Sequence, residues 1–469
     1  MKNIIFTFFI LSFAAQSQTK QTSVEKNIDQ EFLFNEYLGY VKKYHPLVKT
    51  ANLEISMAQA NLMMARGGFD PKIEVDFDKK QFRNQEYYSI LNSSFKIPTW
   101  YGVEIKAGFD ANEGVYLSPE NNLPNQGLTS FGISVPLGQG LLINQRMADI
   151  RKAKIQLKQS QAERKLEAIK VLYDASVAYF YWKKNYNEVQ LYQKYSTNAQ
   201  IRFKGIKELI NQGDKPAIDS IEAGIIVKNR LLSLEDSQLK LNKAKLELSN
   251  FIWIENNIPV ELSDALIPEQ KLDATIQETL KTNDLLNADF SITNHPKINS
   301  LEQQIQALTV DKKLKANLLL PKIDVGYSYL SDPRYFEKYQ FNDYKVGIDF
   351  KFPLFLRKER GTLKLAKFKI QESEFALGIE RVQLTNKINA QKIEIESLTK
   401  QRNLISGLVN DNNTMLQSEE RLFTFGESSL FLINTRENNL VTAQLASIVL
   451  ENRFYISNSE LFKIMANPD

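Results

Sequence analysis

The two histidines of this 469-residue chain are its first candidates for metal or acid-base chemistry. His45 and His295 lie 250 positions apart, each directly before a proline, and the chain has no cysteine. A zinc site needs several nitrogen or sulfur ligands close together, so this pair does not predict one, and only carboxylates remain as ligands for a cation. Proline at the first position of a helix costs no hydrogen bond. We therefore expect both histidines to be structural residues at the start of two helices.

Gly138 and Gly140 precede a predicted helix, as phosphate-binding glycines do. No Lys-Ser or Lys-Thr follows them, and the sequence lacks the dinucleotide fingerprint, the nucleophile elbow and the zinc-protease motif. The missing cysteines exclude a thiol nucleophile, disulfides and a lipid-anchored N-terminal cysteine. We therefore predict a flexible turn at these glycines, and no catalytic residue, cofactor or metal.

Composition and charge describe a folded, exported protein. Hydrophobic residues make up 43% of the chain, which allows a sizeable core, and the 59 basic and 55 acidic residues are interspersed, which excludes a nucleic-acid footprint. Residues 1–17 combine Lys2, a short apolar run and Ala15-Gln16-Ser17, so they predict a signal peptide. No segment approaches the roughly 20 apolar residues of a membrane-spanning helix. Periplasmic, secreted and outer-membrane proteins remain.

The chain contains one unit twice. His45-Pro46 recurs as His295-Pro296, and Pro71-Lys72-Ile73 recurs as Pro321-Lys322-Ile323, both 250 positions later. Val135-Pro136-Leu137 matches Phe352-Pro353-Leu354 only 217 positions later, so the first copy holds about 33 extra residues before this motif. Each copy is predicted to run as helix, strands, very long helix, turn and helix.

Heptad spacing predicts that the long helices pair as antiparallel coiled coils. The seam of the second copy consists of Leu363, Ile370, Leu377, Leu384, Ile388, Ile395, Val409, Leu416 and Phe423. Arg402 occupies its one polar position. Gly213 and Gly426 are predicted to join each long helix to its returning partner. A helix of nearly 70 residues is about 100 Å long, a length for which ordinary globular domains have no use.

Alternating apolar and polar residues predict six strands. They lie at about 72–82, 87–97, 102–110, 129–137, 322–330 and 344–353. Aromatic residues gather near their ends: Tyr87, Tyr88, Trp100, Tyr101, Tyr116, Tyr335, Phe336, Tyr339, Phe341 and Tyr344. A half-buried soluble sheet alternates in the same way, but strands of about ten residues with aromatic ends favour an outer-membrane barrel. Six strands cannot enclose a pore, so several chains must close one barrel.

The junction and tip motifs add a family resemblance. They are His45-Pro46 and His295-Pro296 at the helix starts, Val135 to Gly140 and Phe352 to Phe355 at the strand-to-helix junctions, and Gly213 to Ala223 at the first tip. In this order, duplicated and behind a signal peptide, they resemble the TolC-like outer membrane efflux protein family over essentially the whole mature chain. The resemblance implies a homotrimer with one outer-membrane β-barrel, surrounded by lipid and continuous with a periplasmic helical tunnel. It also implies docking to a periplasmic adaptor (membrane fusion) protein and an inner-membrane pump.

The sequence departs from that family in two places. The family usually contributes four strands per chain, whereas the extra residues of the first copy contain a further hairpin around 87–110, and the sequence leaves open whether it joins the barrel. The second tip of the family often carries acidic residues, but Leu432 and Thr435 stand there in this chain. The predicted tip and gate residues are Gly213, Asp214, Asp219, Glu222, Gly426, Glu427, Leu432 and Thr435. The predicted barrel-to-tunnel junctions are Pro136, Gly138, Gly140 and Pro353.

These observations predict an α+β fold with tandem-duplicated, long antiparallel coiled-coil hairpins and amphipathic strands that form a shared transmembrane β-barrel in a homotrimer. The predicted units are a signal peptide at 1–17, a first repeat at 18–253, a linker at 254–290 and a second repeat at 291–469. Strands lie within about 72–137 and 322–353, and long helices at about 143–212, 214–253, 356–425 and 427–465. The predicted function is passive conduction across the outer membrane in a tripartite efflux or type I secretion system. The alternative is an exported coiled-coil structural or adhesin-like protein with no channel, and the motif search supports no periplasmic enzyme.

Overall fold

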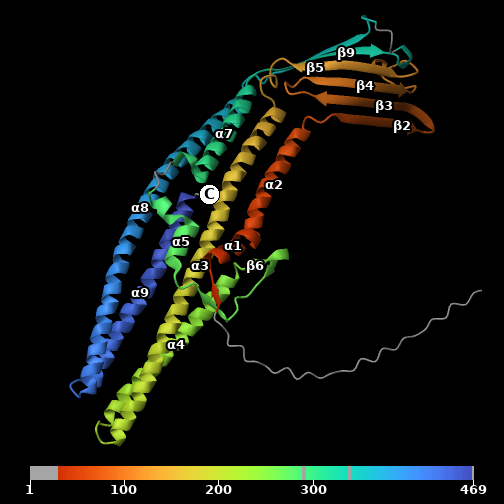
Figure 1. The fold of residues 1–469 in the computed structure, drawn as a ribbon. Coiled ribbons are helices and arrows are strands. Elements are labelled where there is room, and N and C mark those ends of the chain that lie inside the picture. Colours follow the sequence, from red (N-terminus) through yellow and green to blue (C-terminus); the bar gives the residue numbers. More distant parts are fainter. Residues whose placement is uncertain (1–29, 288–291, 336–339, 467–469) are drawn as a thin grey trace, which may run out of the picture.

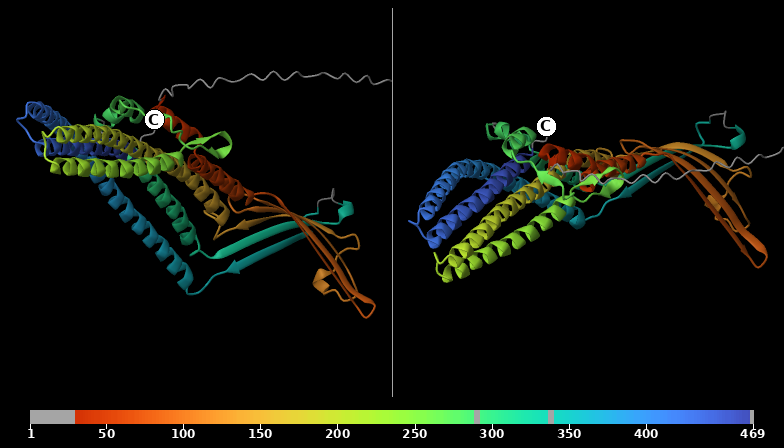
Figure 2. Two further views of the ribbon diagram at one scale, coloured as in Figure 1. Left: turned by 90° about the horizontal axis from the view of Figure 1, so that it is seen from below. Right: turned by 60° about the horizontal axis from the view of Figure 1, so that its bottom comes forward.

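The computed structural model describes residues 30–287, 292–335 and 340–466. Two long helical hairpins run side by side, and a sheet extends from the end of the molecule opposite their tips (Figures 1 and 2). The predicted signal peptide, together with Phe336 and Tyr339 of the aromatic set, lies outside the described residues. The predicted α+β fold of long helical hairpins with amphipathic strands is confirmed.

The first repeat begins with a short strand and two helices. Its elements are β1 (Gln30–Phe32), α1 (Phe34–Tyr44), α2 (Pro46–Gly67), β2 (Lys72–Phe82), β3 (Gln85–Pro98), β4 (Glu104–Glu113), β5 (Leu128–Pro136), α3 (Gln145–Asn211) and α4 (Ile218–Ser249). Short elements then lead to the second repeat: β6 (Trp253–Ile254), β7 (Ile258–Pro259), β8 (Leu266–Pro268), α5 (Leu272–Leu280) and α6 (Thr282–Asn287).

The second repeat contains the counterparts of most of these elements. They are α7 (Pro296–Asn317), β9 (Lys322–Ser331), β10 (Tyr344–Lys351), α8 (Arg357–Thr424) and α9 (Leu430–Met465). The matched helices have nearly the same lengths, 67 residues in α3 and 68 in α8, and 22 residues in both α2 and α7. In the described part of the chain, no helix is long and apolar enough to cross a membrane.

The predicted seam of α8 faces the neighbouring helices. Ile370, Leu384, Ile388 and Ile395 are buried among its residues. Arg402, in the polar position, donates two hydrogen bonds to the Asp273 carboxylate of α5, at 3.0 and 2.9 Å. Its guanidinium also lies 4.3 Å from the centre of the Phe454 ring on α9. The arginine therefore fills an apolar position because its planar head stacks on an aromatic ring while its charge is paired.

Both histidines cap helices, at equivalent places in the two repeats. The Nδ1 atom of His45 accepts a hydrogen bond from the Leu47 N–H at 3.3 Å, and that of His295 accepts one from the Lys297 N–H at 3.1 Å. His295 Nε2 lies 2.9 Å from the carbonyl oxygen of Ile464, so the ring also ties α7 to the end of α9. Burial lowers the pKa of both imidazoles below the usual 6.5. A neutral ring suits the cap because an unprotonated Nδ1 can accept the hydrogen bond from the backbone N–H.

We expect the stability of the helical region to fall as the pH drops below 6.5. The folded state binds fewer protons than the unfolded state there, because the folded-state pKa of both histidines is lowered, so stability is full above 6.5 and is lost through the lowered pKa values. Thermal unfolding at a series of pH values measures the effect. A His45→Asn, His295→Asn variant keeps a capping side chain and should show a smaller dependence on pH between 7 and 5. An unchanged dependence would contradict the assignment.

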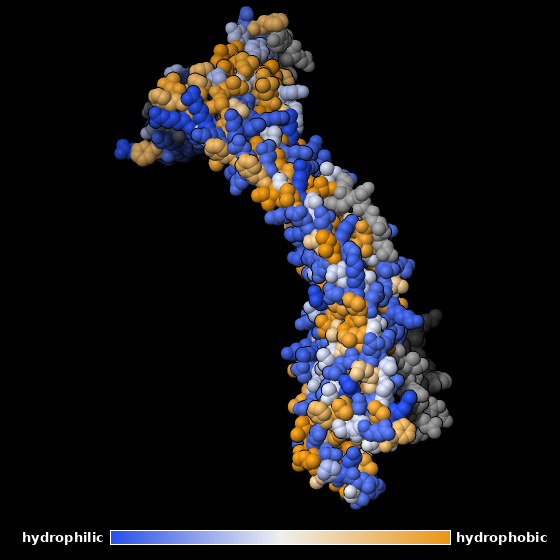
Figure 3. Space-filling view, turned by 90° about the vertical axis from the view of Figure 1, so that its left-hand side faces the viewer, coloured by the Kyte–Doolittle hydropathy of each residue, from blue (hydrophilic) through white to orange (hydrophobic). Residues whose placement is uncertain are grey.

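The six long strands form one antiparallel sheet in the order β10-β9-β5-β4-β3-β2. The two repeats meet where β5 pairs with β9, with Phe131 opposite Tyr329 and Ile133 opposite Tyr327. The register places residues of one kind on each face of the whole sheet. One face carries Val75, Leu91, Phe109, Phe131, Tyr327 and Ile348, and the other carries Asp76, Asn92, Asp110, Ser130, Gly326 and Gly347. Hydrophobic side chains gather over the sheet end of the molecule (Figure 3).

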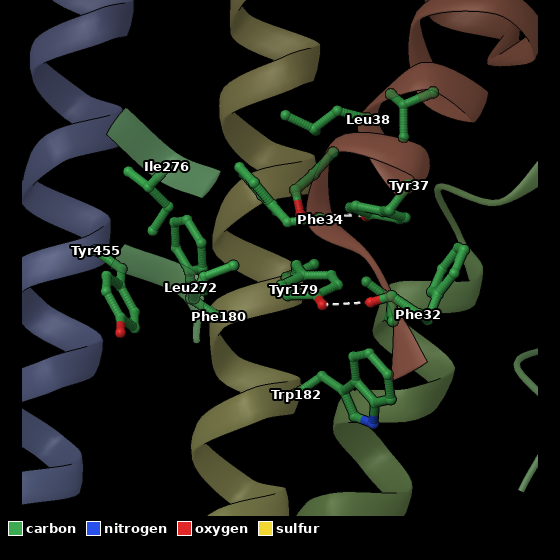
Figure 4. Packing of buried hydrophobic residues seen from close by; sticks show 14 of the residues in the cluster. Phe32, Phe34, Tyr37, Leu38, Tyr179, Phe180, Trp182, Leu272, Ile276 and Tyr455 are labelled. Carbon is green, nitrogen blue, oxygen red and sulfur yellow. Dashed lines mark hydrogen bonds between the residues drawn. The ribbon is translucent and has the colours of Figure 1, made fainter. Parts of the chain in front are cut away.

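The main hydrophobic core lies halfway along the molecule, where α1 and α5 pack around α3 and α9 (Figure 4). Phe34, Tyr37, Tyr179 and Trp182 are fully buried in it. The Tyr179 hydroxyl donates to the Phe32 carbonyl at 2.5 Å and accepts from the Glu269 N–H at 3.0 Å. These contacts fasten both the first residues of the repeat and the segment between the repeats to the middle of α3.

Candidate functional site

The two hairpin tips are built in the same way. Gly213 and Gly426 have φ values of +84° and +76°, in the left-handed region that favours glycine. The Asp214 N–H donates to the Leu209 carbonyl at 2.9 Å, and the Glu427 N–H donates to the Leu422 carbonyl at 3.0 Å. Each bond reaches back five residues and closes the helix end as a Schellman motif. Both tips therefore turn sharply and place an acidic residue directly after the glycine.

The predicted gate residues occupy different environments. Asp214 and Glu427 are exposed at the tips, and Asp219 is half-buried in the first turn of α4. Leu432 is 39% exposed near the start of α9. The Thr435 hydroxyl donates to the Phe431 carbonyl at 2.8 Å within its own helix. Of the predicted set, the tip acids are thus the ones that solvent or a partner reaches most directly.

Glu222 leads to a polar cluster that joins the two hairpins. Its carboxylate accepts a hydrogen bond at 3.1 Å from the Asn434 amide on α9. The centre of this cluster is Glu437, which is 1% exposed. Its carboxylate oxygens accept from Arg202 on α3 at 2.8 Å and from Arg230 on α4 at 3.3 Å. One buried carboxylate therefore holds two arginines that belong to the other hairpin.

Sequence reasoning identified Glu222 but missed Glu437 and its arginines. These residues come together from positions more than 200 apart, at sequence separations of 235 and 207, so no local motif marks them. One signal was present in α9. Ile433, Glu437 and Leu440 share one face of the helix at spacings of four and three, which puts a carboxylate in a row of buried apolar residues. A charge in such a position needs a partner.

Apolar contacts surround this cluster and continue to the tips. Ile206 of α3, Ala223 of α4 and Leu430 of α9 are buried together between the two hairpins. At the tips, the Lys215 ammonium lies 5.2 Å from the centre of the Phe423 ring. Near their tips, the two hairpins therefore contact each other through packed apolar side chains and through the buried ion pairs of Glu437.

The junction of the first repeat is closely packed against the second repeat. The Leu137 N–H donates to the Ile323 carbonyl at 2.7 Å, and the Gln139 N–H donates to the Pro321 carbonyl at 3.0 Å. A Cβ atom on Gly138 would lie 1.9 Å from the same Pro321 oxygen. Gly140 has φ +97°, and the end of Pro136 faces Gly102 in the turn between β3 and β4. This turn is therefore tight, where the sequence predicted a flexible one.

The two junctions differ. Asn144 caps α3 by accepting from the Met147 N–H at 2.9 Å, and its amide donates to the Trp100 carbonyl at 3.0 Å, which fixes the β3–β4 turn to the helix start. Pro353, between β10 and α8, is exposed. Its neighbours Leu354 and Phe355 are 85% and 72% exposed. Leu137, the counterpart of Leu354 in the first junction, is 57% exposed, so the second junction exposes its leucine more.

Replacing Gly138 with alanine is expected to destabilise the fold by about 1–3 kcal/mol, because the new methyl group meets a backbone oxygen that cannot move freely. Gly347 in β10 is the matched control, since a Cβ atom there meets nothing within 4 Å. Thermal unfolding of the two alanine variants measures the difference. Equal unfolding temperatures for the two variants would show that the junction tolerates the shift.

The described residues contain no group of three or more His, Cys, Asp or Glu side chains arranged to hold a metal ion. Several charged groups between and near the hairpins are instead paired in twos and threes, with arginine as the partner. Ion pairs of this kind hold the two hairpins together only while the hairpins stay close, so separation of the hairpins breaks them.

Protein families and solved structures were compared with this chain to find proteins with a similar sequence or fold. Residues 289–467 match the sequence profile of the family described as "Outer membrane efflux protein". No curated protein sequence matches the chain at a significant level. Among solved structures, the chain is similar to the open state of the Neisseria gonorrhoeae MtrE outer membrane channel, with 13% identity, a TM-score of 0.66, and coverage of 97% of this chain and 95% of that one.

Two further outer-membrane proteins have the same fold. The Campylobacter jejuni CmeC outer membrane channel is 13% identical with a TM-score of 0.64, covering 92% of this chain and 85% of that one. The outer membrane protein VceC from Vibrio cholerae is 12% identical with a TM-score of 0.64, covering 92% and 96%. The chain thus shares the fold of these outer-membrane proteins. The second repeat carries the sequence pattern of the outer membrane efflux proteins, and the resemblance to that TolC-like family is confirmed.

Proposed function

We propose that this chain is the outer-membrane channel subunit of a tripartite efflux or type I secretion system and works as a homotrimer. The observation that carries the proposal is the six-stranded sheet, which is apolar over one whole face and polar over the other, and which continues directly into long helical hairpins. Such a sheet is stable when its apolar face contacts lipid and its polar face contacts water, as in the wall of a membrane barrel. The helices then extend the water-filled path through the periplasm.

The proposed channel is passive, and its periplasmic end opens when the hairpins separate. The tips at Gly213 and Gly426, with the exposed acids Asp214 and Glu427, meet the adaptor protein, and an inner-membrane pump supplies the energy. Asp219, Glu222, Leu432 and Thr435 lie just above the tips, where the tunnel narrows. The paired charges around Glu437 favour the closed arrangement because separating α9 from α3 and α4 would leave them without partners.

Two neighbouring residues of β10 provide a test of the membrane barrel. Ile348 lies on the apolar face and is 70% exposed in the single chain, and Gly347 lies on the polar face with open space around its Cβ position. Ile348→Arg is expected to lower barrel stability by about 2–4 kcal/mol per chain when the position lies near the middle of the bilayer, whereas Gly347→Arg should be tolerated. Outer-membrane fractionation and heat-modifiable migration on a gel measure the assembled trimer.

A water-soluble coiled-coil protein would give a different result. The parent chain and both arginine variants would then be recovered outside the outer-membrane fraction. Recovery of a soluble monomer from the periplasm, with no heat-modifiable band and no conductance in planar bilayers, would overturn the proposal. The parent protein and the Gly347→Arg variant serve as matched controls for expression and export.

A further inference from the structure

We propose that each chain of the homotrimer contributes all six strands of its sheet, so that the trimer closes an eighteen-stranded barrel. In this arrangement, β2 of one chain pairs antiparallel with β10 of the next chain. This inference rests on the proposed function. It deepens that function by assigning the β3–β4 hairpin to the membrane wall, where the family resemblance implies four strands per chain and twelve in total.

The hairpin is paired to its neighbours along most of its length. β3 pairs with β2 from Lys72–Lys96 to Phe82–Gln85, and β4 pairs with β5 from Glu104 to Asp110. One uninterrupted row of opposed residues crosses the sheet through Lys72, Lys96, Lys106, Gly132, Ser328 and Lys345. Removing the hairpin from the wall would break two complete strand ladders, and open strand edges are not tolerated in lipid.

The hairpin also has the two faces that a membrane wall requires. Leu91 and Phe95 of β3 lie on the same face as Phe77 and Ile73 of β2, to which they are paired. On β4, Phe109 lies on this apolar face, and Asp110 lies on the opposite one. A hairpin that projected into water would have no use for such a match. The alternation thus extends the lipid-facing surface over all six strands.

The inner end of the hairpin is fastened to the top of the helical tunnel. The Trp100 ring in the β3–β4 turn stacks on Phe69 with ring centres 5.5 Å apart. Glu104, at the start of β4, accepts a hydrogen bond from Arg146 in the first turn of α3 at 2.8 Å. The hairpin therefore starts at the same level as the strands on either side.

The free edges of the sheet fit each other. β2 runs away from the helices and β10 runs toward them, so neighbouring copies place these edges antiparallel. Every residue of both strands is exposed in the single chain. The polar face of β2 carries three carboxylates and two lysines, at Lys72, Glu74, Asp76, Asp78 and Lys80. That of β10 carries Lys345, Asp349 and Lys351. Both edges alternate polar and apolar residues in the same two-faced pattern as the rest of the sheet, which a second copy of this chain matches.

The register also closes at an ordinary barrel geometry. Two registers cover all of β10 and keep polar residues opposite polar ones, with Lys345 opposite Asp78 or opposite Lys80 of the next copy. Within one chain, the row of opposed residues connects Lys72 of β2 to Lys345 of β10. In the barrel, Lys345 lies opposite residue 78 or 80 of the next chain. The strand register therefore shifts by six or eight residues per chain. With a rise of about 3.3 Å per residue and strands about 4.8 Å apart, the strand tilt is about 35° or 42°, within the usual range of barrels.

The curvature of the sheet agrees with a closed wall. Gly132 of β5 lies on the polar face, and a Cβ atom there would stand 2.2 Å from the Tyr327 carbonyl oxygen of β9. The strands approach closely on this face because no side chain separates them, which bends the sheet toward its polar side. Barrel diameter grows roughly in proportion to strand number, so eighteen strands give a barrel about 1.5 times as wide as twelve.

Thiol labelling of the trimer in phospholipid vesicles tests the place of the hairpin. The parent chain has no cysteine, so each introduced thiol is unique. We expect a charged, water-soluble maleimide to label Asn92→Cys and Asp110→Cys at least tenfold faster than their apolar neighbours Leu91→Cys and Phe109→Cys. On β10, Asp349→Cys and Ile348→Cys form the reference pair, because that strand belongs to the membrane wall under the proposed function alone.

The outcomes separate the two proposals. Equal labelling of both members of each hairpin pair, with strong alternation on β10, would overturn the eighteen-stranded wall and leave the channel intact. Absence of alternation on β10 as well would overturn the channel itself. Only alternation on all three strands supports both.

Cross-linking between copies tests the β2–β10 contact. Oxidation of a Lys345→Cys chain that also carries Asp78→Cys or Lys80→Cys is expected to give disulfide-linked dimers and trimers for one of the two pairs, which identifies the register. Lys345→Cys combined with Asn92→Cys is the control, since β3 lies inside the sheet and should give no ladder. Disulfide-linked dimers and trimers from the control pair, or their absence from both test pairs, would overturn the β2–β10 contact.

Discussion

Replacing Glu437 with alanine is expected to open the periplasmic end of the proposed channel. The Glu437 carboxylate is buried between Arg202 and Arg230, and its loss leaves both guanidinium groups without their shared partner across the two hairpins. Breaking one partner of a buried ionic group costs about 3–5 kcal/mol. If that loss falls on the closed arrangement, the closed-to-open ratio drops by roughly two to three and a half orders of magnitude. Conductance in planar bilayers measures the open fraction.

Glu427→Ala is the matched control for this prediction. It removes an acid that is exposed at the tip, so it should leave the open fraction nearly unchanged. Glu437→Gln keeps the shape of the side chain without its charge and should lie between the parent chain and the alanine variant. If Glu437→Ala conducts like the parent chain while its trimer is intact, the ionic centre does not hold the hairpins closed.

The second large effect is expected at Trp182, where truncation to alanine should destabilise the middle of the molecule by about 3–5 kcal/mol. The indole is fully buried in the main core, and its ring lies 5.4 Å from that of Tyr179 at an interplanar angle of 84°. A cavity of this size loosens the attachment of α1 and the inter-repeat segment to α3. The denaturant concentration at half-unfolding, followed by tryptophan-independent circular dichroism, measures the loss.

Tyr181 is the matched control, since it is the preceding residue on α3 and is 42% exposed. Tyr181→Ala should change the free energy of unfolding far less than Trp182→Ala. Similar losses for the two variants would mean that helix propensity or trimer contacts, and not the core, determine stability there.

The repeated helices could be predicted from the sequence because their signals are local. Heptad spacing identifies the seam of α8, and Gly213 and Gly426 mark the tips because a left-handed turn needs glycine. The two histidines could be recognised as structural for the same reason, since the proline that follows each of them marks a helix start. Each of these inferences needs only a few neighbouring residues.

The remaining features depend on contacts between distant residues. Alternation predicted the strands around 87–110, but it does not say which strand lies beside which, so only the structure shows that β3 and β4 complete one sheet with the second repeat. The Glu437 cluster was missed because its members come from three helices. The junction at Gly138 was predicted as a flexible turn, because the close Pro321 carbonyl that makes it tight comes from the other repeat.

The open edges of the sheet also affect how the chain assembles into a trimer in the membrane. A single copy carries two exposed strand edges and an uncovered apolar face, which are the features that lead unassembled chains to aggregate. Such a copy is safest when it is kept apart from others until a membrane and two further copies are at hand. Newly exported chains should therefore depend on periplasmic chaperones, and a variant that slows trimer formation should be removed by proteases before it reaches the membrane.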